Sequence, residues 1–141
     1  MGLIHLDAGV VIGFLDADDA HHPAARGLLV QAADEGDHLA LAASALAECL
    51  VGPARHGDAA VDVVRTLIER LPAEVVHLDT ETATAAARLR ARHRSLRLPD
   101  ALVIATAGVA GADQLVTTDT RWPTAKAMGL PLMIHVLQAG G

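Results

Sequence analysis

The sequence has almost no aromatic residues and a single cysteine, and each shortage excludes a class of protein. Phe14 and Trp122 are the only Phe, Tyr or Trp residues among 141, so a core must be built from aliphatic and small side chains. Alanine supplies 29 residues, which favours closely packed helices. The lone cysteine, Cys49, excludes an internal disulfide framework and a multi-cysteine zinc site.

The chain also lacks a long apolar run and a leader-like start. A stretch of about 18 uncharged apolar residues does not occur, which argues against a membrane span. The opening MGLIHLDAGVV has no basic segment followed by a long apolar one, so a signal peptide is not expected. We therefore expect a cytoplasmic protein that does not contact a membrane.

Basic residues are fewer than acidic ones. The 17 acids and 11 bases give a formal charge of -6 and a pI near 5.7. This balance argues against a protein that coats nucleic acid through bulk positive charge, although an active site depends on local charge instead. Hydrophobic residues make up 52 %, which excludes intrinsic disorder, and we expect residues 1–141 to form a single domain.

Short apolar runs alternate with longer helical patterns along the chain. Strands are predicted at residues 3–6, 39–42, 75–78, 114–117 and 131–136. Helices are predicted at about 9–17, 22–36, 44–52, 58–70, 80–94 and 100–109, with Ser44 and Asp58 as caps. Strands separated by helices need crossover connections. The pattern therefore predicts an α/β fold with a mostly parallel five-stranded sheet covered on both faces.

Four acidic residues occupy positions that suit a ligand site in such a sheet. Asp7 ends the first predicted strand and Asp119 follows the fourth, and ligands bind beyond the carboxyl ends of parallel strands. Asp100 lies in the first turn of a helix, and Glu48 lies inside the apolar helix ASALAECL. Each acid alone could be a cap, a turn residue or a solvated-face residue. Together they favour a site for a hard divalent cation, because converging carboxylates repel one another without one.

The motifs around these acids resemble those of PIN-domain ribonucleases, and their order and spacing are most similar to the VapC toxins of bacterial toxin–antitoxin pairs. The motifs are LDAGVVIGFLD at Asp7, SALAECL at Glu48, LPDALVIATA at Asp100 and LVTTDTRW at Asp119. Each motif is short, but the four occur in the right order on the expected elements. The resemblance covers essentially the whole chain.

The resemblance implies a PIN-like three-layer α/β/α sandwich with the first and fourth strands adjacent at its centre. It implies an endoribonuclease that depends on Mg²⁺ or Mn²⁺, with Asp7, Asp100 and Asp119 as metal ligands. Glu48 would bind a second ion or orient the attacking water, and Thr117 would hold a ligand or a water. The implied partners are an RNA substrate, a cognate antitoxin protein and a second copy in a homodimer.

One position departs from the family pattern and keeps an alternative open. The family usually has a small hydroxyl or amide residue two places after the first acid, and this chain has Gly9 there. The departure puts a supporting hydrogen bond near Asp7 in doubt. A PIN-like interaction module without catalytic activity is therefore the alternative hypothesis.

A phosphoaspartate protein is a further rival, because Asp7 ends the first strand. The haloacid-dehalogenase pattern needs a second Asp two residues after Asp7, where Gly9 stands. A receiver domain needs an acidic pair at this strand end and a lysine after a late strand. The only lysine, Lys126, falls in a predicted helix. These differences disfavour the phosphoaspartate class.

Half of the ten arginines cluster just before Asp100. They are Arg88, Arg90, Arg92, Arg94 and Arg97. On a continuous helix Arg90, Arg94 and Arg97 would share one face. This face is either simply solvated or an RNA-binding patch that steers phosphates toward the acidic site.

Three other residues with possible chemistry are expected to be structural. Asp79 stands at a helix start and is interpreted as a cap. Asp113 precedes its strand and should lie at the opposite edge of the sheet from the site. Cys49 is interpreted as a small buried hydrophobe.

Overall fold

One parallel sheet forms the centre of the computed structural model, which describes residues 1–140. Its strands are β1 (Leu3–Leu6), β2 (His38–Ala42), β3 (Ala73–Val76), β4 (Gln114–Thr117) and β5 (Met133–Val136). Their order is β3-β2-β1-β4-β5, and every neighbouring pair is parallel. The expected adjacency of the first and fourth strands is confirmed, and the sheet is wholly rather than mostly parallel.

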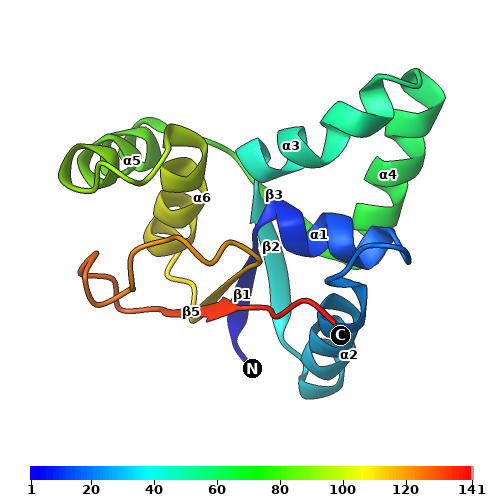
Figure 1. Ribbon diagram of the computed structural model, residues 1–141, viewed down its shortest axis with the longest axis horizontal. Helices are drawn as coiled ribbons and strands as arrows, with labels where there is room; N and C mark the ends of the chain where they lie inside the picture. Colours follow the sequence, from blue (N-terminus) through cyan, green and yellow to red (C-terminus); the bar gives the residue numbers. More distant parts are fainter. Residues whose placement is uncertain (141) are drawn as a thin grey trace.

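Helices connect the strands and cover both faces of the sheet. They are α1 (Ala8–Leu15), α2 (His22–Glu35), α3 (Ala43–Ala54), α4 (Asp58–Arg70), α5 (Thr80–Arg92) and α6 (Leu98–Val109). In Figure 1, α5 and α6 lie on one side of the strands and the other four helices on the opposite side. The three-layer α/β/α arrangement is therefore confirmed. Covering both faces is what a parallel sheet requires, because its strands are apolar on both.

The core is built from aliphatic and small side chains, as the composition predicts. Leu6 on β1, Leu41 on β2 and Leu115 on β4 are inaccessible to solvent. Alanines on α6 let the helix approach the sheet closely, and all of them are buried: Ala101, Ala105 and Ala107. Phe14 and Trp122 only pack against the edge of this core.

Several predicted element boundaries are wrong. β3 covers residues 73–76 rather than 75–78, because its pairing with β2 ends at Ala42↔Val76, where β2 itself ends. β5 begins at Met133 rather than at residue 131. α5 ends at Arg92 because His93 leaves the helical conformation, with φ -124 and ψ 91.

Two of the predicted helix caps, Ser44 and Asp58, are also wrong. The residue before α3 is Ala42, which makes no side-chain cap, and Ser44 lies within the helix. Gly57 precedes α4, so Asp58 is its first helical residue rather than its cap. Asp58 still lies where an acid interacts favourably with the helix dipole.

Candidate active site

Asp7 and Thr117 lie side by side at the carboxyl ends of the two central strands. The β1–β4 pairing runs to Leu6↔Val116, so the next residue of each strand meets at this edge. The Thr117 hydroxyl donates a hydrogen bond of 2.7 Å to Asp7 Oδ2, and the Ala8 N–H donates one of 2.9 Å to Asp7 Oδ1. Both oxygens of the buried Asp7 carboxylate are therefore held in place.

Thr117 also connects Asp7 to Asp119. Its hydroxyl oxygen accepts a hydrogen bond of 3.1 Å from the backbone N–H of Asp119, and the residue is inaccessible to solvent. One buried hydroxyl thus positions the side chain of the first acid and the backbone of the last. The two acids are more than a hundred positions apart in the chain and share the support of this hydroxyl.

The other two acids come from helices in different layers. Asp100 lies in the first turn of α6, and Glu48 lies on the exposed side of α3. Asp100 is close enough to Asp7 to disfavour its ionisation, and both acids act in the same way on Glu48. Asp119 also disfavours the ionisation of Asp7. All four predicted acids are therefore close enough for the charge of one to affect another.

Burial and mutual repulsion raise the pKa of two of these acids. Burial is the largest cause for Asp7, opposed by its hydrogen bonds from Thr117 and Ala8, with repulsion from Asp100 and Asp119 adding to the rise in its pKa. Partial burial also raises the pKa of Glu48, and the nearby Asp7 and Asp100 raise it further. Such shifts are common where several carboxylates share a functional site.

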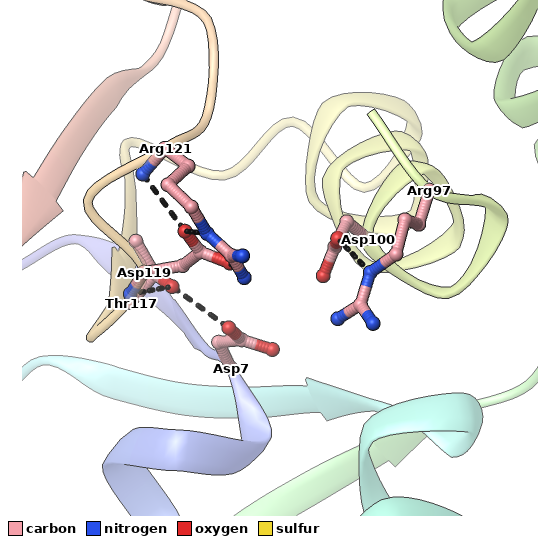
Figure 2. A network of polar contacts seen from close by, with 6 residues as sticks. All are labelled: Asp7, Arg97, Asp100, Thr117, Asp119 and Arg121. Carbon is pink, nitrogen blue, oxygen red and sulfur yellow. Dashed lines mark hydrogen bonds and ion pairs between the residues drawn. The ribbon is translucent and has the colours of Figure 1, made fainter. Parts of the chain in front are cut away.

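Two arginines pair with the remaining acids. Arg121 donates from Nε to Asp119 Oδ1 and from a terminal nitrogen to Oδ2, each at 3.3 Å. Arg97 Nε lies 3.5 Å from an Asp100 oxygen. Figure 2 shows both guanidinium groups turned toward the space beside Asp7. Burial opposes ionisation of Asp119, but its hydrogen bonds with Arg121 prevail, so the pKa of Asp119 is lowered.

The predicted arginine face is not formed. α5 ends at Arg92, so only Arg90 is helical, while Arg94 lies in a turn and Arg97 precedes α6. The prediction that Arg90, Arg94 and Arg97 share one helix face is therefore wrong. Within residues 1–140, Arg97 is the member of this trio that pairs with an acid of the site.

Arg121 is the site residue that the sequence interpretation missed. The available signal is its position two residues after Asp119, in TTDTRW. At that spacing after a strand end, a turn can fold the side chain back onto the carboxylate. The backbone N–H of Arg121 also donates to Asp119 Oδ1 at 2.8 Å, which closes this turn.

The donor set suits a divalent cation such as Mg²⁺ or Mn²⁺. Asp7, Asp100 and Asp119 offer only carboxylate oxygens, and the paired strands and α6 hold them at one edge. As the side chains stand, however, no three acidic, histidine or cysteine groups among residues 1–140 are grouped closely enough to hold a metal ion. Asp100 and Asp119 are instead paired with Arg97 and Arg121.

Three residues expected to be structural are placed as predicted. The Asp79 carboxylate caps α5 by accepting from the Thr82 N–H at 2.8 Å. Asp113 binds the Leu3 N–H at the amino end of β1, away from the acids. Cys49 is buried in α3, and burial followed by repulsion from Glu48 and Asp7 raises the pKa of its thiol to about 12.

Solved structures of other proteins share this fold. The VapBC2 structure from Rickettsia felis, bound to a DNA fragment from its promoter, superposes with a TM-score of 0.72 at 16 % identity, covering 96 % of this chain and 99 % of that one. VapC20 of Mycobacterium tuberculosis, a toxin that cleaves the sarcin–ricin loop, gives a TM-score of 0.68 at 19 % identity and coverages of 90 % and 95 %. FitAcB of Neisseria gonorrhoeae gives 0.65 at 18 % identity and coverages of 94 % and 96 %.

At these identities the superpositions show a shared fold. None of the curated proteins matches the sequence. The PIN domain family, however, matches residues 4–127, a span that contains all four acids. The chain belongs to the PIN domain family.

Proposed function

We propose that this chain is a Mg²⁺-dependent endoribonuclease and the toxin of a type II toxin–antitoxin pair. The observation that carries the proposal is that Asp7, Asp100 and Asp119 surround one space at the edge of the sheet (Figure 2), with both Asp7 oxygens held by hydrogen bonds. An oxygen-only donor set of this kind suits Mg²⁺ or Mn²⁺. RNA is the proposed substrate, and residues 1–141 act as one domain.

Each residue of the site has a proposed task. Asp7, Asp100 and Asp119 would hold the ion, which would supply an activated water and stabilise charge on the leaving oxygen. Thr117 orients Asp7 by donating to Oδ2. Glu48, whose pKa is raised, orients the attacking water and accepts its proton at a carboxylate oxygen.

The proposed partners follow from the similar structures. VapBC2 supports a cognate antitoxin as the protein partner, and VapC20, described as cleaving the sarcin–ricin loop, supports an RNA substrate. A homodimer and a cytoplasmic location are part of the same proposal. None of the helices described within residues 1–140 has the length and apolar character to cross a membrane.

The proposal is tested by cleavage of a mixed RNA substrate in Mg²⁺ and in EDTA. We expect cleavage in Mg²⁺ and none in EDTA. The products should carry no 2′,3′-cyclic phosphate ends, because a water rather than the 2′-hydroxyl attacks phosphorus. Asp7→Asn keeps the side-chain shape and should lower the rate by at least about hundredfold. Asp62→Asn, an exposed acid on α4, is the matched control and should cleave normally.

Two outcomes contradict the proposal. Cleavage that persists in EDTA or in the Asp7→Asn variant would exclude the metal-dependent mechanism. A folded wild-type protein that binds an antitoxin but cleaves no RNA in Mg²⁺ or Mn²⁺ would favour the alternative, a PIN-like interaction module without catalytic activity.

A further inference from the structure

We propose that Arg121 competes with the metal ion for Asp119 and, once displaced, binds a phosphate of the RNA. The inference rests on the proposed nuclease function and adds a coupling between metal binding and RNA binding. Arg97 would act in the same way on Asp100, more weakly. The two arginines would thus make the site ready for RNA only when the metal is present.

The Arg121–Asp119 pair engages the whole carboxylate. Nε binds one oxygen and a terminal nitrogen binds the other, each at 3.3 Å, and the backbone N–H of Arg121 adds a bond of 2.8 Å to Oδ1. A two-pronged guanidinium contact is the geometry in which arginine binds carboxylates most specifically. A cation that coordinates Asp119 must therefore share or replace these contacts.

The displaced side chain would remain at the site. Arg121 is two residues from Asp119 in the chain, and 78 % of its side-chain surface is exposed against 17 % for Asp119. The acid is thus held by the fold, while the arginine can change its direction at little cost. A guanidinium released beside the carboxylates would meet the phosphates of an approaching RNA, for which its fork is equally suited.

The Arg97–Asp100 pair supplies an internal comparison. A single nitrogen of Arg97 approaches one oxygen of Asp100 at 3.5 Å, and 72 % of the Arg97 side chain is exposed. A single long contact contributes less than a two-pronged one. Removing Arg97 should therefore change metal affinity less than removing Arg121.

The first experiment measures Mn²⁺ binding to the full-length protein by calorimetry in the absence of RNA. We expect Arg121→Ala to bind Mn²⁺ about fivefold more tightly than wild type, since an exposed pair contributes of the order of this factor. Arg121→Lys keeps the charge but not the two-pronged guanidinium, so its Mn²⁺ affinity should lie between those of wild type and Arg121→Ala. Arg94→Ala, at an exposed arginine in the turn between α5 and α6, removes a charge without removing a pair with an acid of the site, and its Mn²⁺ affinity should match that of wild type.

The second experiment measures binding of a short RNA by fluorescence anisotropy, with and without Ca²⁺ in place of Mg²⁺ to slow cleavage. Adding the ion should raise RNA affinity about fivefold more in wild type than in Arg121→Ala, because coupling between two ligands is reciprocal. In Arg94→Ala the gain in RNA affinity on adding the ion should equal that of wild type. The circular dichroism spectrum of each variant should match that of wild type, because the substituted side chains are exposed.

The outcomes separate this inference from the proposed function. Arg121→Ala that binds Mn²⁺ no more tightly than wild type, or an equal gain in RNA affinity in both proteins, overturns the role of Arg121 alone. A wild-type protein that binds no Mn²⁺ at all overturns the proposed nuclease function as well.

Discussion

The Thr118 hydroxyl occupies the space that a Cβ atom would need at Gly9. The Cβ and Cγ2 atoms of Thr118 each lie 3.4 Å from that point, so the residue rests against the first turn of α1. The absence of a side chain at Gly9 therefore allows Thr118 to approach the helix this closely. A side chain at position 9 would collide with Thr118, so glycine at this position has a steric reason.

This contact predicts an unusual response to Gly9→Ala. A glycine-to-alanine change within a helix ordinarily stabilises a protein, because alanine has the higher helix propensity. Here the new methyl group collides with Thr118, and we expect a loss of about 1–3 kcal/mol in the free energy of unfolding. Urea unfolding measures it, and Thr118→Ala in the same chain should restore most of the loss. A Gly9→Ala variant more stable than wild type would contradict the contact.

Thr117→Val tests the shared support of the two acids. Valine keeps the shape but removes the hydroxyl, so Asp7 Oδ2 loses its donor and the Asp119 N–H loses its acceptor. We expect a loss of about 1–3 kcal/mol in unfolding free energy, because these groups are largely buried. Metal affinity should fall by about 10- to 100-fold. Thr117→Ser keeps the hydroxyl and should retain both properties.

The layers of the fold and the meeting of the acids could be predicted from the chain. Asp7 and Asp119 follow apolar strands, and parallel strands end at the same edge, so their approach follows from the fold class. The adjacency of β1 and β4 required the family resemblance, since helical crossovers allow several strand orders. The boundaries of β3 could not be predicted, because its ends depend on pairing with β2.

The arrangement of the arginines was out of reach for a different reason. The turn after α5 buries Leu96, a tertiary contact that periodicity does not report, and it separates Arg94 from the helix. The Arg121–Asp119 pair depends on how a short turn folds after β4. Exposed side chains of this kind leave no hydrophobic pattern, so only their spacing could suggest the contact.

The Asp79 cap of α5 predicts how the stability of the protein depends on pH. Hydrogen bonds with Thr82, first from its backbone, lower the pKa of the Asp79 carboxyl below its ordinary value of 3.8. Because the pKa is lowered in the folded state, the ionised Asp79 cap stabilises the protein above about pH 4. The stabilisation is lost as the pH falls through the pKa that Asp79 has in the folded protein. Asp79→Ala should therefore lower the urea midpoint at pH 7 and converge toward wild type in acid. Asp79→Asn, which can still cap α5, should differ less at pH 7.

Cys49 should be unreactive in the folded protein. Burial and the nearby carboxylates raise the pKa of its thiol from 9.0 to about 12, so the nucleophilic thiolate is scarce at neutral pH. A chromogenic disulfide reagent at pH 8 should label the thiol only after unfolding in urea. Cys49→Ala should retain RNA cleavage. Rapid labelling of the native protein would show that the thiol is accessible and ionised.

The central claim is that carboxylates from three separate segments bind one divalent ion, and a Mn²⁺ titration of single variants tests it most directly. We predict that wild type binds Mn²⁺, that Asp100→Asn and Asp119→Asn each weaken binding by at least about tenfold, and that Asp62→Asn on α4 does not. Binding that is absent from wild type, or equally strong in all these proteins, would contradict the account.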